Sequence, residues 1–129
     1  RWPGFDDGVY AGARILEILS READPSAALE ALPSAVNTPE LQIRMAEGEN
    51  KAFIARLQKE ARFDDALDVI TIDGVRVEWN DGFALARSSN TTPVVVLRLE
   101  GDTPEALERI KKTFAEVLLK VEPSLELPF

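Results

Sequence analysis

Val69-Ile70-Thr71-Ile72-Asp73-Gly74-Val75-Arg76-Val77-Glu78-Trp79 is the stretch of this 129-residue chain that decides its fold. Two runs rich in β-branched residues flank the dipeptide Asp73-Gly74, and the second run alternates apolar and polar residues as a half-buried strand does. Asp-Gly is a favoured two-residue connection between antiparallel strands. The stretch therefore predicts a β-hairpin with a two-residue turn at Asp73-Gly74.

Two more strands are predicted after this hairpin. Asn80-Asp81-Gly82 has the composition of a second turn, and the strand that follows it ends close to Arg87. The residues of that strand alternate between two faces, with Phe83, Leu85 and Arg87 on one and Ala84, Ala86 and Ser88 on the other. Residues 94–99 are apolar except for Arg98, which predicts a central strand covered on both faces.

One earlier strand and two helices complete the predicted domain. Residues 41–45 alternate apolar and polar side chains, whereas residues 49–63 place their apolar side chains on one helical face. Thr103 and Pro104 are suited to begin the last helix. Its apolar stripe consists of Leu107, Ile110, Phe114, Val117 and Val121. The predicted fold class is α+β, an antiparallel β-sheet with two helices packed on one face, preceded by a helical segment from a neighbouring domain.

The N-terminal part predicts helices without strands to pack on. Residues 5–22 carry apolar residues at helical spacing, with Asp6 and Asp7 placed to cap the helix, and residues 26–32 form a second short helix. Residues 34–39 have the composition of a linker. We therefore expect a helical remnant of a preceding domain at 1–33, a linker or hinge at 34–39, and a separate domain at 40–129. The two tryptophans, Trp2 and Trp79, are assigned to a core or a former domain interface.

Composition excludes several classes of function. Because the chain has no cysteine and no histidine, it cannot assemble a Ser-His or Cys-His nucleophile pair or the usual structural zinc site. The net charge of −8 opposes binding to nucleic acid or to an anionic membrane surface. No apolar run approaches the length of a membrane helix, so we expect a soluble protein. Isolated acidic pairs such as Asp64-Asp65 are interpreted as caps or solvated charges, and no metal site is predicted.

The segment between the last two predicted strands combines a cation with short polar side chains. Arg87 is followed by Ser88-Ser89-Asn90-Thr91-Thr92 and then Pro93. Residues 83–99 contain two cations and no carboxylate, so this stretch is locally positive in an acidic chain. A phosphate dianion prefers a bidentate guanidinium, hydroxyl or amide donors, and backbone N–H groups brought together by a tight turn. The alternative is an ordinary polar loop, because Ser, Asn and Thr are common in loops.

Several motifs of the chain resemble one enzyme family. The string Arg-x-Ser-Asn-Thr-x-Pro at residues 87–93 resembles the phosphate-binding loop in the fourth domain of α-D-phosphohexomutases. Gly4-Phe5-Asp6-Asp7-Gly8 resembles the segment that opens the last helix of their third domain. The turn at residues 73–77 and the ending at residues 123–129 are similar to the bacterial phosphomannomutase/phosphoglucomutase branch. The chain thus resembles the C-terminal domain of that branch, domain 4, with the last helix of domain 3.

The resemblance implies a function for a longer parent protein. In that family a phosphoserine outside the present chain exchanges phosphoryl groups with a hexose phosphate through a 1,6-bisphosphate intermediate, which also activates the enzyme. Mg²⁺ supports the transfer, and its ligands lie on another domain. The parent would be a cytoplasmic, monomeric isomerase that interconverts hexose 1-phosphate and 6-phosphate, with glucose or mannose as the sugar. The partners of this chain would be the phosphosugar and the other domains of its own parent, and the fragment alone would be inactive.

The resemblance also implies a role for each residue of the loop. Arg87 would clamp phosphate oxygens, Ser89, Asn90 and Thr91 would donate from side chains or backbone, and Ser88 would contribute chiefly its amide. None of them would be catalytic. The chain departs from the family where Thr92 replaces a common Glu and Val96 replaces an Arg found in several relatives; Arg98 either takes over that role or is a structural strand cation.

The function that competes with this one is a non-catalytic regulatory or interaction module. Antiparallel sheets with two helices serve many such roles, because a fold does not determine a function. A nucleic-acid-binding module is disfavoured by the acidity of the chain.

Overall fold

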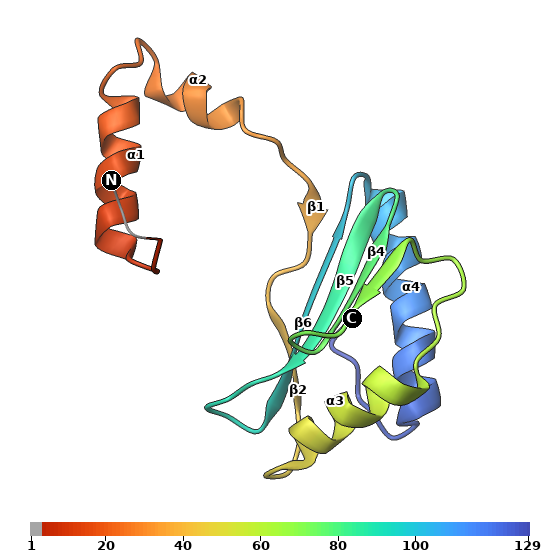
Figure 1. Ribbon diagram of the computed structural model, residues 1–129. Coiled ribbons are helices and arrows are strands. Elements are labelled where there is room, and N and C mark those ends of the chain that lie inside the picture. Colours follow the sequence, from red (N-terminus) through yellow and green to blue (C-terminus); the bar gives the residue numbers. More distant parts are fainter. Residues whose placement is uncertain (1–3) are drawn as a thin grey trace. The chain divides into compact units, whose positions relative to one another are not determined.

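The structure is a computed structural model that describes residues 4–129. The chain divides into two compact units, Arg1–Ser34 and Ala35–Phe129, which are considered separately below. The larger unit contains the sheet and the predicted phosphate loop (Figure 1).

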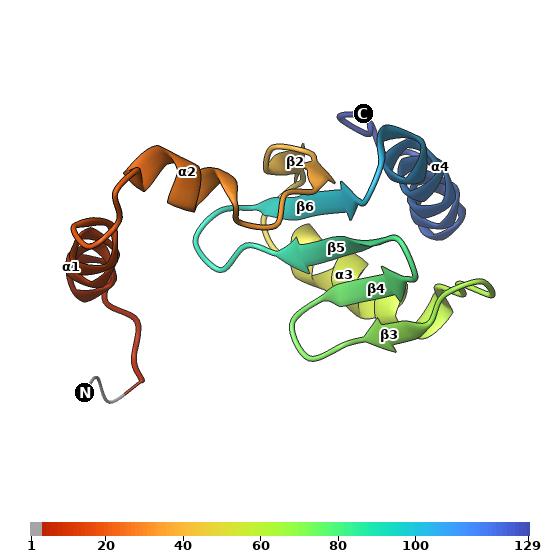
Figure 2. The same cartoon turned by 90° about the horizontal axis from the view of Figure 1, so that it is seen from above.

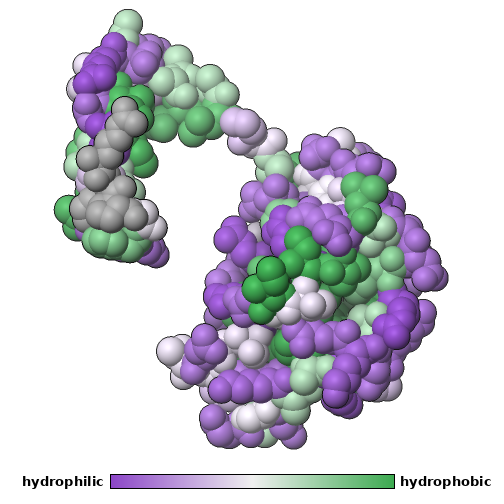
Figure 3. All heavy atoms as spheres, viewed as in Figure 1, coloured by the Kyte–Doolittle hydropathy of each residue, from purple (hydrophilic) through white to green (hydrophobic). Residues whose placement is uncertain are grey.

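The smaller unit consists of two helices, α1 (Gly8–Leu19) and α2 (Pro25–Glu30). Asp7 caps α1 by accepting a hydrogen bond from the Tyr10 N–H, as the sequence predicts, and Asp24 caps α2 in the same way. Neither helix contains a buried residue. Hydrophobic side chains are accordingly visible on the surface of this unit (Figure 3), and the exposed ones are Phe5, Val9, Ile15, Leu16, Ile18, Leu29 and Leu32.

The larger unit contains six strands and two helices among the described residues. The strands are β1 (Val36–Asn37), β2 (Leu41–Arg44), β3 (Asp68–Ile70), β4 (Val75–Trp79), β5 (Gly82–Ser88) and β6 (Val94–Gly101), and the helices are α3 (Glu49–Glu60) and α4 (Pro104–Val121). All strand pairs are antiparallel, in the order β1-β6-β5-β4-β3, with β2 paired to the same edge of β6 as β1. The predicted α+β fold class is confirmed.

Strand β6 is central, because β5 pairs along one of its edges and β2 and β1 pair along the other. Val95, Leu97 and Leu99 of β6 are fully buried on the face that carries the helices. On the opposite face Val94 and Val96 are buried but Arg98 is exposed. The prediction of a central strand is therefore confirmed, while coverage of both faces holds only for the first half of β6.

Helices α3 and α4 both pack their apolar side chains into the core on one face of the sheet. In Figure 2 α3 is seen behind the strands of the sheet. The predicted apolar stripe of α4 is buried along its whole length, and α3 buries Phe53, Ile54 and Leu57. Thr103 caps α4 through the Ala106 N–H, with Pro104 in the first helical turn. Trp79 is also in the core, against the ring of Phe63, whereas Trp2 lies outside the described residues.

The prediction of a two-residue turn at Asp73-Gly74 is wrong. Ile70 pairs with Arg76, so five residues, from Thr71 to Val75, form a wider connection between the last paired residues of β3 and β4. The side chain of Gln58, on α3, donates hydrogen bonds to the carbonyl oxygens of Thr71 at 3.1 Å and Gly74 at 3.0 Å. This contact from a distant helix satisfies carbonyl groups that a wider loop would otherwise leave without partners. The two-residue connection lies instead at residues 80–81, since Trp79 pairs with Gly82.

Part of the predicted linker belongs to the sheet. Val36 and Asn37 of β1 pair with Gly101 and Glu100. Thr38 is buried, donates its N–H to the Leu99 carbonyl at 2.9 Å and accepts the Leu99 N–H on its hydroxyl at 3.2 Å. The assignment of residues 34–39 as a linker or hinge stays a prediction, and only Ser34 and Ala35 of that segment precede β1.

Gly74 is required by the close approach of the β3–β4 loop to β5. Its φ is +89°, and a Cβ atom there would lie 2.2 Å from the Ala86 carbonyl oxygen. We predict that Gly74→Ala lowers the free energy of unfolding by roughly 2 to 5 kcal/mol, from left-handed strain together with the collision. Urea unfolding followed by circular dichroism measures this loss.

The matched control is Gly48→Ala, because Gly48 also has a positive φ, +81°, but has open space around its Cβ position. It should lose only about 1 to 2 kcal/mol from backbone strain. Equal losses in the two variants would show that the contact with β5 contributes nothing.

Candidate functional site

Arg87 lies near the end of β5, on the face of the sheet that the helices leave uncovered. Ala84 and Ala86 are fully buried against the helices, so Phe83, Leu85 and Arg87 are on the opposite face, as the alternation predicts. The side chain of Arg87 is 39 % exposed, and its Nη1 atom lies 3.8 Å from Oδ2 of Asp73, in the β3–β4 loop. The guanidinium is therefore accessible and has one loosely paired carboxylate as its neighbour.

The loop that follows β5 is organised around the hydroxyl oxygen of Ser89. Three donors converge on this atom: the N–H groups of Thr91 and Thr92, each at 3.3 Å, and the hydroxyl of Thr92 at 2.9 Å. The Thr91 hydroxyl is 3.4 Å away. A turn that directs several donors at one oxygen position is the arrangement that binds an anion oxygen. In the present structure the serine oxygen occupies that position.

The loop is closed by backbone hydrogen bonds at its base. Ser89 N–H donates to the Val94 carbonyl at 2.9 Å, and Val94 N–H donates to the Thr92 carbonyl at 2.8 Å. Asn90 and Thr91, at the tip, are exposed to solvent. The predicted donors are thus held on a short connection between two paired strands.

Ser88 extends beyond the neighbouring strand. Strand β4 begins at Val75, opposite Ala86, so no residue of β4 lies opposite Ser88. Since hydrogen-bonding directions alternate along an antiparallel strand and Ser89 N–H points to β6, the Ser88 amide points to the edge where β4 is absent. This orientation is compatible with the amide role expected for Ser88.

Asn50, on α3, supports the loop from beneath. Its side-chain Nδ2 donates to the carbonyl oxygens of Ser89 at 3.1 Å, Thr92 at 3.3 Å and Val94 at 3.3 Å. Only 3 % of Asn50 is exposed. The side chain therefore joins both ends of the loop to the first turn of the helix.

Arg98 shares the uncovered face with Arg87. Arg87 pairs with Val96 on β6, and Arg98 is two residues further along that strand, which places the two arginines on a cross-strand diagonal. Diagonal neighbours on one face are about 7 to 8 Å apart, within reach of long side chains. The sheet face beside the loop thus carries two cations contributed by neighbouring strands.

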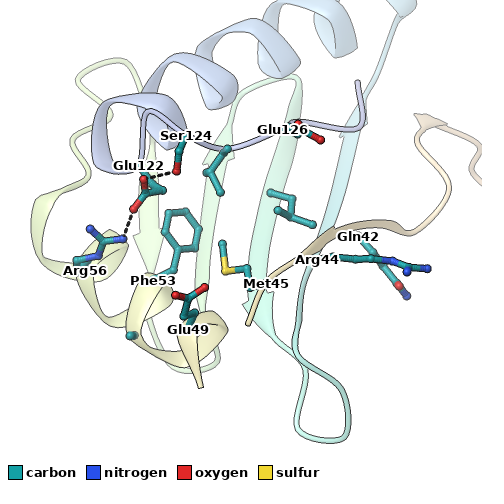
Figure 4. A pocket seen from close by; sticks show the side chains of 12 residues that line it. Gln42, Arg44, Met45, Glu49, Phe53, Arg56, Glu122, Ser124 and Glu126 are labelled. Atoms are coloured by element: carbon teal, nitrogen blue, oxygen red, sulfur yellow. Dashed lines mark hydrogen bonds and ion pairs between the residues drawn. The ribbon is translucent and has the colours of Figure 1, made fainter. Parts of the chain in front are cut away.

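A sizeable hollow of the domain lies away from the loop. A pocket of about 730 Å³ is lined by β2, α3 and the segment after α4, with Met45 and Phe53 at its centre (Figure 4), and no residue of the loop lines it. A second hollow of about 380 Å³ is lined by Thr92, Pro93 and residues of β2. Of these two hollows only the second borders the predicted phosphate loop, through Thr92, and the tip of the loop is exposed to solvent.

An ion pair borders the larger pocket. Arg56 Nη2 donates to Glu122 Oε2 at 2.6 Å, and the Ser124 hydroxyl donates to Glu122 Oε1 at 2.7 Å (Figure 4). These hydrogen bonds lower the pKa of the Glu122 carboxyl from its ordinary 4.5 to about 2, and the bond from Arg56 has the larger effect. The pair joins α3 to the end of α4.

Among residues 4–129, no group of three or more acidic side chains is close enough together to hold a metal ion. No helix in the same range is long and apolar enough to span a membrane.

The structure brings together residues that sequence reasoning did not connect. Asn50 and Asp73 lie beside the loop, although they are far from it in the sequence. Neither position carried a signal: an asparagine in the first turn of a helix and an aspartate in a hairpin loop are both common for local reasons. Only the packing of α3 and of the β3–β4 loop against β5 reveals them.

Comparison with known proteins gives consistent matches. The sequence profile of the phosphoglucomutase/phosphomannomutase C-terminal domain matches residues 40–117. The chain is 56 % identical over 119 residues to a phosphoglucomutase of Neisseria meningitidis and 48 % identical over 130 residues to a phosphomannomutase/phosphoglucomutase of Pseudomonas aeruginosa. These matches cover 92 % and 100 % of this chain but only 26 % and 28 % of the relatives.

A solved structure is similar over nearly the whole chain. A phosphoglucomutase/phosphomannomutase family protein of Burkholderia thailandensis matches with a TM-score of 0.87 and 57 % identity, covering 99 % of this chain and 27 % of the other. The chain therefore spans about a quarter of the length of the proteins it matches.

The Arg56–Glu122 pair gives stability a defined pH dependence. Because the pKa of Glu122 is lowered in the folded state, its contribution is present above pH 4.5 and is lost as the pH falls towards about 2. We predict that Glu122→Gln is less stable than the unaltered chain near neutral pH and that this difference disappears in acid. Urea unfolding at a series of pH values measures it.

The control is a double-mutant cycle with Arg56→Gln, which should lose the larger part of the same pH-dependent contribution and keep the part that Ser124 supplies. A stability difference that stays constant across the acid range would contradict the assignment.

Proposed function

This chain belongs to the phosphoglucomutase/phosphomannomutase family, whose C-terminal domain it matches. From that premise we propose that residues 87–92, which are the end of β5 and the loop that follows it, grip the non-reacting phosphate of a phosphosugar. The family membership covers a quarter of the relatives' length, so the reaction of a longer parent protein is part of the proposal. That reaction interconverts hexose 1-phosphate and 6-phosphate through a phosphoserine and a 1,6-bisphosphate. The serine and the ligands of Mg²⁺ belong to other parts of the parent.

The observation that carries the proposal is the convergence of donors at the loop. The N–H groups of Thr91 and Thr92 point at the position of the Ser89 hydroxyl oxygen, next to the accessible guanidinium of Arg87. Rotation of the Ser89 side chain would open this position to a phosphate oxygen and free the hydroxyl to donate as well. The same set of groups would then hold one phosphate from several directions.

The neighbouring carboxylate does not prevent binding. The Asp73 carboxylate and the Arg87 guanidinium are 3.8 Å apart, and both side chains are exposed. Surface ion pairs of this kind contribute only about 0 to 1 kcal/mol to stability. A hydrogen bond to a charged group contributes about 1.5 to 3 kcal/mol. A phosphate that accepts two bonds from Arg87 therefore outcompetes Asp73 for the guanidinium.

Gripping the phosphate that does not react is useful because it positions the one that does. A fixed remote phosphate aligns the reacting oxygen with the phosphoserine, and well-oriented reactants can recover about 7 to 11 kcal/mol of the barrier. None of the loop residues exchanges a proton or forms a bond with phosphorus in this proposal. Since the tip of the loop is exposed to solvent, the rest of the parent must supply the remaining walls of the site.

We further propose that the domain closes over the bound sugar about a hinge before β1. Residues 36–38 are hydrogen-bonded to β6 and move with the sheet, which leaves residues 33–35 as the segment able to rotate. Closure would exclude water from the phosphoserine, which water could otherwise hydrolyse.

The phosphate role predicts a localised response to ligand. Titrating the chain with glucose 1-phosphate or mannose 1-phosphate at millimolar concentration should shift backbone amide resonances at residues 87–92. Arg87→Ala should weaken the binding about 10-fold to 100-fold, because bonds to a charged group are lost.

The control for this titration is Lys112→Ala, which removes the same charge from an exposed position on α4. It should leave the affinity unchanged. Shifts spread over a helix face, or no shifts in the unaltered chain, would favour an interaction module instead.

The hinge predicts a contrast between two prolines in the full-length parent. Pro33→Gly should change kcat and KM together, because it alters the segment before β1. Pro39→Gly lies between β1 and β2, both paired to β6, and should change them much less. Equal effects, or none, would argue against a hinge at residues 33–35.

A further inference from the structure

We propose that Asn50 is a positioning residue that holds the phosphate loop in its binding geometry before any ligand arrives. The inference rests on the proposed function of the loop. It concerns a residue of α3 that lies 37 positions before Arg87 in the sequence. Asn50 would not touch the phosphate. It acts through the carbonyl groups that it binds.

The hydrogen bonds of Asn50 reach both ends of the loop. Its acceptors are the carbonyl of Ser89, at the start, and those of Thr92 and Val94, at the end. An amide nitrogen carries two hydrogens, so the three carbonyls share them. One side chain thus sets the separation between the two sides of the loop.

The same contacts determine which way the donors point. The C=O and N–H of one planar trans peptide unit point in opposite directions. When the Ser89 carbonyl turns towards Asn50, the Asn90 N–H of that peptide turns away from α3, to the side open to a ligand. By binding the Ser89 carbonyl on the side of α3, Asn50 therefore directs the Asn90 N–H to the opposite side.

Leucine and aspartate, which match asparagine most closely in shape, cannot perform this task. Only 3 % of the surface of Asn50 is exposed, so water does not readily replace its hydrogen bonds. Leucine has a comparable shape but no donor. It would remove the side-chain bonds to all three carbonyls and leave the Ser89 carbonyl without its partner, because those of Thr92 and Val94 also accept backbone N–H groups. Aspartate has the same shape but presents oxygen atoms to three carbonyl oxygens, which repels them.

Loss of the three Asn50 hydrogen bonds should weaken phosphate binding, because a smaller fraction of molecules then has the loop in its binding conformation. The apparent dissociation constant equals the intrinsic one divided by the fraction of molecules in the binding conformation. If the loop without Asn50 adopts that conformation about a tenth of the time, affinity falls about tenfold with every phosphate-contacting residue still present.

The test compares Asn50→Asp and Asn50→Leu with a matched control, Thr38→Val. Thr38 is also a buried polar residue, at 7 % exposure, and it bonds to β6, but near Leu99, away from the loop. Each variant of the 129-residue chain is titrated with glucose 1-phosphate and with inorganic phosphate, and amide hydrogen exchange of residues 89–92 is measured without ligand. Urea unfolding of each variant measures how far stability alone has changed.

The expected result separates positioning from general stability. Both Asn50 variants should bind about tenfold more weakly and exchange their loop amides faster without ligand, while Thr38→Val loses stability but keeps its affinity and its loop protection. Unchanged affinity and exchange in the Asn50 variants would overturn the inference. So would an equal loss of affinity in Thr38→Val.

Two further outcomes are informative. If the unaltered chain does not bind phosphate at all, the proposed function fails, whereas the exchange data still decide whether Asn50 orders the loop. If both Asn50 variants fail to fold, the test uses the unaltered chain instead and follows the side-chain amide resonances of Asn50. Slow exchange with solvent and a shift on adding phosphate are expected for these resonances; fast exchange would overturn the proposal.

Discussion

The antiparallel pairing of β6 with strands on both of its edges is the constraint on which the rest of this domain depends. β5 occupies one edge of β6, and β2 and β1 occupy the other. β4 and β3 then follow in order beyond β5. Val95, Leu97 and Leu99 then present one continuous apolar surface, and α3 and α4 cover it because their own apolar faces have no alternative partner. Burial of this single layer fixes the register of the strands, since a shift by one residue would exchange the buried and exposed faces.

The candidate site follows from that pairing. The loop at residues 89–93 is short and joins two strands whose register is determined by the core, so its ends have little freedom. Asn50 adds a second constraint from the helical layer, and the Asp73-Gly74 segment adds a third from the β3–β4 loop, which approaches β5 at Ala86 and Arg87. Functional residues on a loop are commonly held by a rigid scaffold in this way. Here the scaffold reaches the loop from three separate elements.

The positive charges on the uncovered sheet face differ in how far neighbouring groups compensate them. The uncovered sheet face carries Arg76, Arg87 and Arg98, but they are not equivalent. Arg76 donates to Glu78 at 2.6 Å and lies 3.6 Å above the ring of Phe83, so its positive charge is already compensated. Within residues 4–129, the one carboxylate paired with Arg87 is that of Asp73, at 3.8 Å. Local geometry, and not the net charge of −8, therefore determines whether this surface attracts a phosphate.

The sequence by itself determined the type of every helix and strand except β1, the faces of the strands and the position of the loop beside Arg87. Periodicity and capping residues are local signals, and Thr103, Asp7 and the stripe of α4 act in the structure as their patterns indicate. Only the tertiary structure decided the width of the β3–β4 loop, the pairing of residues 36–38 with β6 and the hydrogen bonds of Asn50 to the predicted phosphate loop. Each of these depends on a hydrogen bond between residues far apart in the chain, such as that from Gln58 to Thr71. No local pattern encodes such a contact, because its partners meet only after the core has formed.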